Sequence, residues 1–175
     1  SLIIETLLRK QKNNPLLIGK AGVGKTALVE ELARRIKYHE VPEELEGMEI
    51  ISLEMGSLVA GTKYRGEFEE KLNKIIKEVM SEKNIILFID EIHSMVNAGG
   101  AEGAISASDI LKPYLARGSS KVIGATTLEE YHEFLEHDKA LDRRFERILI
   151  EEPTKSEMKK ILTQIVPSYE SHYDL

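Results

Sequence analysis

One octapeptide limits the possible folds of this chain more than any other feature. Residues 19–26 read GKAGVGKT, which fits the pattern G-x-x-x-x-G-K-[ST]. A short apolar run at residues 15–19 comes before it and predicts a buried strand. After it, apolar residues recur at every fourth position of residues 24–38, which predicts one face of a helix. A glycine-rich turn in this setting is typical of α/β folds that bind phosphate groups.

The rest of the chain alternates between strand and helix patterns. Residues 85–90 (IILFID) are apolar on both faces, as expected of a central strand in a parallel sheet. We therefore predict an α/β fold, a three-layer sandwich whose mainly parallel five-stranded sheet carries helices on both faces. Further strands are predicted at residues 50–55, 121–127 and 147–151, and further helices at 66–81, 105–117 (with a kink or break at Pro113), 140–145 and 155–165.

Ligands of such sheets bind at the carboxyl ends of the strands, where two motifs of this chain meet. The loop glycines permit backbone angles that turn several N–H groups toward one anion. Lys25 can reach the β- and γ-phosphates of a nucleotide, and the Thr26 hydroxyl can bind Mg²⁺. Asp90 is the expected partner of that Mg²⁺, and Glu91 can polarise a water molecule for attack on a γ-phosphate.

Three weaker motifs each have a structural alternative. Thr127 ends the predicted strand at 121–127 and can contact water or phosphate, but threonine is common in strands. Arg143 and Arg144 are either an exposed charged pair or arginine fingers that reach a γ-phosphate. Lys63 and Tyr64 lie in a predicted mobile loop within residues 56–66, which offers the ring to a partner unless Tyr64 is a core residue.

Composition excludes several classes of function. With 24 basic and 30 acidic residues the net charge is −6, which argues against a general nucleic-acid binder. The absence of cysteine excludes disulfides and thiol catalysis. The longest apolar run, residues 85–89, is far shorter than a membrane span. We therefore expect a cytoplasmic location, bacterial or in an organelle stroma. The histidines have no metal-ligand spacing and are interpreted as ordinary polar residues: His39, His93, His132, His137 and His172.

Six segments in this order resemble the Clp unfoldases of the AAA+ class. They are GKAGVGKT, GTKYRGEFEEKL, ILFIDEIH, GAEGAISASDILKPYLARG, IGATTLEEY and ALDRRFER, and together they cover nearly the whole chain. The resemblance is to the first nucleotide-binding module, and the fourth segment favours the ClpC type over the ClpB type. It implies a P-loop NTPase fold and a homo-hexameric ring that hydrolyses ATP with Mg²⁺ and threads unfolded polypeptide through its pore.

The resemblance also implies roles for individual residues. Glu91 is the catalytic carboxylate, Thr127 the polar sensor, and Arg143 and Arg144 the fingers donated to the neighbouring subunit. Tyr64, with Lys63 beside it, is the aromatic residue that grips substrate in the pore. The phosphate-binding residues are Gly19, Lys20, Ala21, Gly22, Val23, Gly24, Lys25 and Thr26.

The chain departs from the family pattern at one place, and it matches only part of a family module. The family usually has Glu-Pro where this chain has Lys20-Ala21, so the loop is expected to be less rigid and more cationic. Residues 1–152 match the large subdomain and residues 153–175 the truncated start of a helical segment, so the fragment alone is expected to be weakly active. A protease ring and adaptors are possible partners of such proteins. The alternative is an AAA+ clamp- or helicase-loader acting on DNA, which the acidic charge and the Lys-Tyr-Arg loop disfavour.

Overall fold

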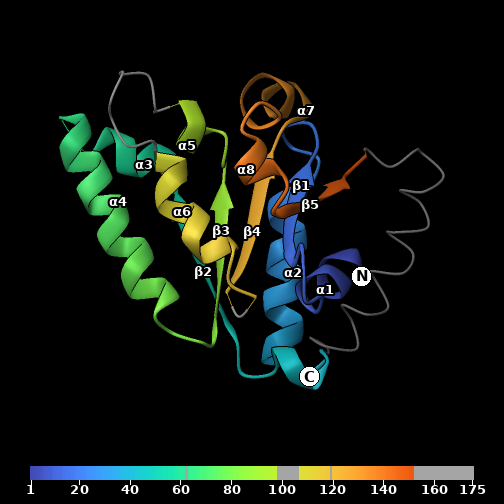
Figure 1. Cartoon of the computed structure of the whole chain (residues 1–175). Helices are drawn as coiled ribbons and strands as arrows, with labels where there is room; N and C mark the ends of the chain where they lie inside the picture. Colours follow the sequence, from blue (N-terminus) through green and yellow to red (C-terminus); the bar gives the residue numbers. More distant parts are fainter. Residues whose placement is uncertain (62, 98–106, 119, 152–175) are drawn as a thin grey trace.

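A computed structural model describes residues 1–61, 63–97, 107–118 and 120–151 (Figure 1). The predicted helix at 155–165, the predicted segment 153–175 and the whole GAEGAI motif (residues 100–105) lie outside these residues. In chain order the elements are α1 (Leu2–Leu7), β1 (Asn14–Ile18), α2 (Lys25–Lys37), η1 (Glu43–Leu45), β2 (Glu49–Glu54), α3 (Met55–Ala60), α4 (Arg65–Met80), β3 (Ile85–Asp90), α5 (Ser94–Asn97), α6 (Ala107–Leu115), β4 (Lys121–Thr126), α7 (Leu128–Glu130), η2 (Tyr131–Leu135), α8 (Lys139–Asp142) and β5 (Phe145–Leu149).

Within the described residues, five strands form one sheet in the order β2-β3-β4-β1-β5. Every neighbouring pair is parallel. The predicted parallel α/β fold is therefore confirmed. Figure 1 shows the carboxyl ends of β1, β3 and β4 at the top of the molecule, beside α5, α7 and α8.

Two hydrophobic cores lie on opposite faces of the sheet, because successive side chains of a strand point to opposite sides. Leu16 and Ile18 of β1 belong to the core under α4 and α6, whereas Leu17 between them belongs to the core under α1 and α2. The same division holds along β3, where Leu87 and Ile89 face the first core. Helices thus cover both faces, which confirms the predicted three layers.

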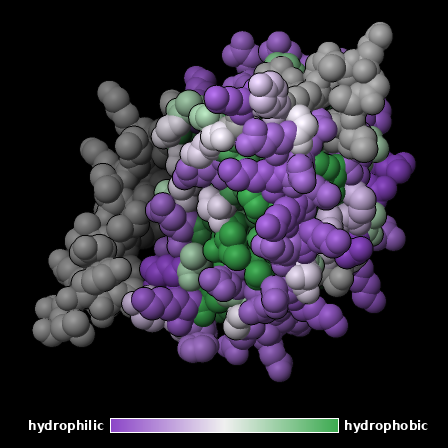
Figure 2. All heavy atoms as spheres, turned by 90° about the vertical axis from the view of Figure 1, so that its left-hand side faces the viewer, coloured by the Kyte–Doolittle hydropathy of each residue, from purple (hydrophilic) through white to green (hydrophobic). Residues whose placement is uncertain are grey.

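The long helices show the predicted amphipathic pattern. In α4 the buried residues Phe68, Leu72 and Ile76 lie on one stripe. Figure 2 faces this side of the molecule and shows mostly hydrophilic residues, with a smaller hydrophobic area near the centre. The outer surface of α4 is accordingly solvated.

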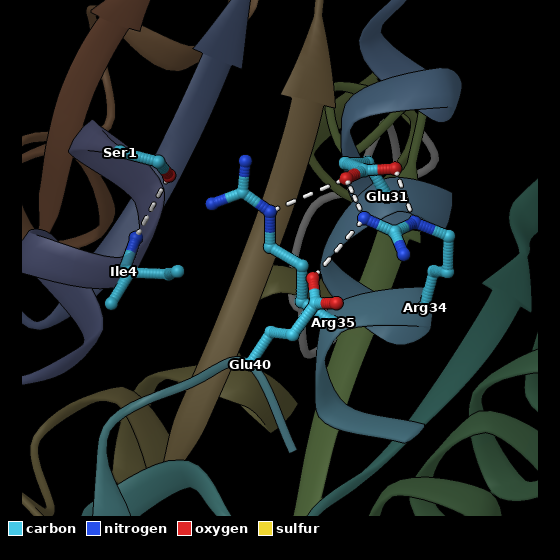
Figure 3. A network of polar contacts seen from close by, with 6 residues as sticks. All are labelled: Ser1, Ile4, Glu31, Arg34, Arg35 and Glu40. Atoms are coloured by element: carbon cyan, nitrogen blue, oxygen red, sulfur yellow. Dashed lines mark hydrogen bonds and ion pairs between the residues drawn. The ribbon is translucent and has the colours of Figure 1, made fainter. Parts of the chain in front are cut away.

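Charged residues link the end of α2 to the following turn (Figure 3). The Glu31 carboxylate accepts hydrogen bonds from Arg34, at 2.7 and 2.9 Å, and from Arg35 at 3.3 Å. Arg34 also reaches Glu40 at 3.4 Å. The hydrogen bond from Arg34 is the main cause that lowers the pKa of Glu31 to about 2.

The structure differs from the sequence predictions at several places, for example in α8, which ends at Asp142 and not at the predicted residue 145. Residues 56–60, predicted as loop, belong to the helix α3, which directly follows β2. The last strand begins at Phe145, two residues before the predicted start, because Phe145 is buried and pairs with Asn14 of β1. Pro113 stands inside α6, and the helix continues to Leu115. In the described part of the chain, no helix is both long and apolar enough to cross a membrane.

Candidate functional site

The glycine-rich loop joins β1 to α2 in the conformation that an anion site needs. Gly22 and Gly24 have φ angles of 80° and 105°, a region that only glycine enters readily. Gly24 is the N-cap of α2, so Lys25 and Thr26 are the first two residues of that helix. The free N–H groups and positive dipole end of α2 therefore point into the loop, where they favour a phosphate.

Lys25 folds back over the loop that precedes it. Its Nζ donates to the carbonyl of Gly19 and, at 3.3 Å, to that of Lys20. Burial lowers the pKa of Lys25, while the nearby carboxylates of Asp90 and Glu130 act in the opposite direction. A phosphate group in the loop would supply a closer negative charge for this ammonium group.

Asp90 and Glu91 lie at the carboxyl end of β3. Asp90 is the last residue of the strand, and its Oδ1 accepts a hydrogen bond from the backbone N–H of Glu91 at 2.9 Å. Glu91 itself has φ of 51°, in the left-handed region that non-glycine residues seldom adopt. Such conformations often occur at functional sites, and this one places an exposed carboxylate directly after a buried strand.

The loop and both carboxylates line one pocket of about 360 Å³. Thr127, the predicted sensor, lies on its wall as well. The sequence-predicted residues that meet there are Ala21, Gly22, Gly24, Lys25, Thr26, Asp90, Glu91 and Thr127, and the unpredicted ones are His93, Thr126 and Glu130.

The two threonines at the end of β4 have different surroundings. Thr127 is the N-cap of α7, where its hydroxyl accepts from the Glu130 backbone N–H at 3.2 Å and donates to the Glu130 carboxylate at 3.4 Å. Thr126 is 2% exposed, and its Oγ1 lies 2.8 Å from Nδ1 of His93. Nε2 of His93 in turn lies 2.5 Å from Oε2 of Glu130.

His93, which the sequence analysis interpreted as an ordinary polar residue, proves to be part of the pocket wall. Its side chain is buried between β4 and α7, stacks against Phe134 and lines the pocket. The signal available in the sequence was its position, two residues after Glu91 at the end of a buried strand. Among the described residues there is no group of three His, Asp or Glu side chains placed to hold a metal.

A second pocket, of about 250 Å³, adjoins the same glycine-rich loop and was not predicted. Gly19, Lys20 and Val23 of the loop form one part of its lining. The remainder is mostly apolar and comes from the end of β1, the start of α7 and the end of β5: Ile18, Leu128, Leu149, Ile150 and Glu151. All eight predicted phosphate-loop residues thus line one of these two pockets.

Arg143 and Arg144 do not line either pocket. They follow α8 and line a separate pocket of about 310 Å³ with Lys10 and Lys12. The Asn14 side chain, fully buried in β1, donates to the Arg144 carbonyl at 3.3 Å and so ties this turn to the sheet. The Arg144 Nε is buried and, within the described residues, has no hydrogen-bond partner.

The Tyr64 side chain lies at the surface of the molecule and not in a hydrophobic core. It is 74% exposed and is the N-cap residue of α4, so the alternative of a core tyrosine is wrong. Lys63 beside it is exposed too. The predicted loop is shorter than expected, because α3 ends at Ala60 and α4 begins at Arg65, and Thr62 lies outside the described residues.

Comparison with known proteins gives a consistent result. The model of the family "ATPase family associated with various cellular activities (AAA)" matches residues 15–152. The ATP-binding subunit ClpC of the ATP-dependent Clp protease of Staphylococcus saprophyticus is 56% identical over 171 residues, and the chaperone protein ClpB of Oceanobacillus iheyensis is 55% identical. Each match covers 98% of this chain and 21% of the relative, so the chain spans about a fifth of these curated relatives.

A solved structure agrees with this result. A closed-state cryo-EM reconstruction of Hsp104 with ATPyS and FITC casein matches with a TM-score of 0.78 and 44% identity, over 99% of this chain and 30% of that chain. The expected P-loop fold of AAA+ type is thereby confirmed. The nearly equal identities to ClpC and ClpB do not separate these two types.

Proposed function

The chain belongs to the AAA family of ATPases, and from this we propose that it is the ATP-hydrolysing module of a ring-forming protein unfoldase. One observation carries the proposal. Residues of the phosphate loop, the Asp90–Glu91 pair, and Thr126 and Thr127 at the end of β4 come from three separate parts of the sequence and line a single pocket. A phosphate-binding helix end opposite two carboxylates is the arrangement that phosphoryl transfer to water requires.

Each side chain of the pocket has a proposed role. Lys25 leaves the loop carbonyls and binds the β- and γ-phosphates. Thr26 and Asp90 hold Mg²⁺, which takes oxygen ligands and completes its shell with phosphates and water, so a dense protein cage is not needed. Glu91 orients the attacking water as catalytic base, and Thr127 is the polar sensor.

We assign the second pocket to the base of the nucleotide. It lies beside the loop, and Ile18, Val23 and Ile150 give it apolar walls against which a flat ring can pack. Lys20, which stands where the family usually has Glu, lines the same pocket and adds a cation beside the phosphates.

Arg143 and Arg144 are proposed to serve the neighbouring subunit of a homo-hexamer. They lie outside their own nucleotide pocket, and the Arg144 Nε lacks a partner within the described residues. No ion pair is seen for either guanidinium group among the described residues, so both groups are available to an anion from another subunit. The γ-phosphate bound by the next subunit is that ligand in this proposal.

Unfolded polypeptide is the proposed substrate, gripped by Tyr64 with Lys63 beside it. A tyrosine ring that is 74% exposed offers a flat apolar face to any passing side chain. The relatives are named as a chaperone and as a protease subunit, and Hsp104 was solved with casein, which favour this substrate over DNA. A bacterial cytoplasm, and partners such as a protease ring or adaptors, belong to the same proposal.

The test is ATP turnover by the full-length protein, with and without an unfolded substrate. Glu91→Gln should keep ATP bound and stop turnover, because the amide keeps the shape and loses the charge that polarises water. Tyr64→Ala should hydrolyse ATP and fail to unfold a tagged fluorescent protein. Tyr64→Phe, which keeps the ring, is the matched control and should unfold it. Turnover in Glu91→Gln, or unfolding by Tyr64→Ala, would contradict these roles.

A further inference from the structure

We propose that His93 is a positioning residue for ATP hydrolysis that acts through the hydroxyl of Thr126. This inference rests on the proposed ATPase function of the pocket and adds to it a residue that the roles above do not use. His93 joins two elements of the pocket wall, because its ring lies between Thr126 at the end of β4 and Glu130 at the end of α7.

The partners of the ring determine which nitrogen carries the proton. An ionised carboxylate can only accept hydrogen bonds, so Nε2, 2.5 Å from Oε2 of Glu130, is the donor. In the neutral ring Nδ1 is then an acceptor. The hydroxyl of Thr126, 2.8 Å away, therefore donates its proton to His93.

The hydrogen bond to His93 determines whether the Thr126 hydroxyl acts as a donor or as an acceptor toward the pocket. With its proton directed to His93, the oxygen keeps lone pairs that can accept a hydrogen bond, and Thr126 lines the same pocket as Lys25 and Glu91. A water molecule placed for attack donates one proton to Glu91 and needs an acceptor for its other proton. Thr126 is such an acceptor. Within the described residues its hydroxyl has one competing acceptor for its proton, the Thr127 carbonyl, but that contact is 3.5 Å long, so the 2.8 Å contact to His93 is the stronger one.

Burial makes the arrangement rigid. Thr126 is 2% exposed and His93 8%, and the imidazole stacks on Phe134 with ring centres 6.2 Å apart. Glu130 is held as well, since it contacts Thr127 at 3.4 Å. The chain Glu130–His93–Thr126 therefore keeps one hydroxyl orientation, which is the condition for fast reaction from a fixed geometry.

The experiment measures kcat and KM for ATP in the full-length protein. His93→Gln keeps a donor toward Glu130 and loses the acceptor toward Thr126, and Thr126→Val keeps the shape and loses the hydroxyl. Each should lower kcat about 10–100-fold, the usual cost of losing an outer partner of a site, with KM within about twofold. The double variant should be no slower than the worse single variant, because both remove the same contact.

Two further variants give the inference a conservative rescue and a matched control. His93→Asn places an amide near the former Nδ1 and should recover part of the lost kcat. His132 offers the control, because it also pairs with a carboxylate, Glu136 at 2.8 Å, but is exposed and lines no pocket of the site. His132→Gln should leave kcat unchanged.

The outcomes separate the two proposals. A wild-type protein without ATP turnover would overturn the proposed function. Wild-type turnover together with unchanged kcat in His93→Gln or Thr126→Val would overturn the role of His93 alone. Additive losses in the double variant would do the same, because they would show that His93 and Thr126 act separately.

Discussion

Gly19 lies where the chain leaves the sheet, and adding one methyl group there should damage both stability and nucleotide binding. Its N–H donates to the Thr126 carbonyl at 3.1 Å, and the residue before it accepts from the N–H of Ile150 at 2.7 Å. Hydrogen bonds to the end of β4 on one side and to the residue after β5 on the other thus hold the backbone of residues 18 and 19 in place. A Cβ at residue 19 would lie 2.6 Å from the Ile150 carbonyl oxygen and 2.9 Å from Cγ1 of Val23.

These distances set the expected size of the effect for Gly19→Ala. The carbonyl is backbone in a parallel ladder, so relief requires β1 and the chain after β5 to separate by several tenths of an ångström. Overpacking of this kind costs about 1–3 kcal/mol of the free energy of unfolding. For a domain of this size each kcal/mol corresponds to about 2–4 °C in Tm, so a fall of about 2–12 °C is expected. Because Gly19, Val23 and Ile150 line the pocket assigned to the base, nucleotide affinity should fall too.

Gly56→Ala is the matched control, since it adds the same methyl group elsewhere. Gly56 lies in α3, and a Cβ there would meet nothing within 4 Å. Alanine in a helix stabilises by about 0.5–1 kcal/mol relative to glycine, so Tm should rise by about 1–4 °C. Calorimetric unfolding and ATP titration of both variants against the wild type test the reasoning. An unchanged Tm and affinity in Gly19→Ala would show that the close approach to Ile150 is not a constraint.

Four further predictions concern single side chains. Lys25→Ala should abolish measurable ATP binding, because each charge-assisted contact contributes about 1.5–3 kcal/mol, or about 10–150-fold in affinity; titration calorimetry checks this. Asp90→Asn should weaken binding only when Mg²⁺ is present, which titrations with and without EDTA would show. Arg143→Ala or Arg144→Ala should slow hydrolysis in the ring by up to about 10³-fold, and mixing either with Glu91→Gln subunits should restore activity at mixed interfaces; no recovery would place the arginines in their own subunit's structure. Glu31→Gln should cost about 0.5–1 kcal/mol at pH 7, the range of exposed ion pairs, and less at pH 3, because a carboxylate whose folded pKa is lowered to about 2 stabilises the fold above its ordinary pKa and loses that effect as the pH falls; urea unfolding at both pH values measures it.

The parts of the site that follow from the sequence are those whose pattern is local. Glycine spacing around Lys25 needs only a strand before it and a helix after it, and both are visible as apolar periodicity. Asp90 and Glu91 end a run that is apolar on both faces, so their place at the edge of the sheet follows from the parallel topology.

The parts that do not follow depend on contacts between distant segments. The burial of His93 arises only when residues 128–135 fold over the end of β4, and this segment includes a π-helical turn, η2, which no simple periodicity predicts. The pocket assigned to the base likewise needs Ile150 to meet Val23. α3 was missed because its sequence, MGSLVA, is too short for a helical period to show.

The position of β1 in the sheet also determines when the phosphate loop can form during protein synthesis. Among the five described strands β1 is made first, yet it lies between β4 and β5, which are made fourth and fifth. About 100 residues separate Ile18 from Lys121, which takes the ribosome roughly 5–20 s at 5–20 residues per second. Through this interval the apolar residues Leu16, Leu17 and Ile18 lack both of the strands that flank them in the folded sheet. A newly made chain therefore exposes the segment before its own nucleotide site until its sheet is nearly complete, and we expect that segment to be the one that nascent-chain chaperones bind.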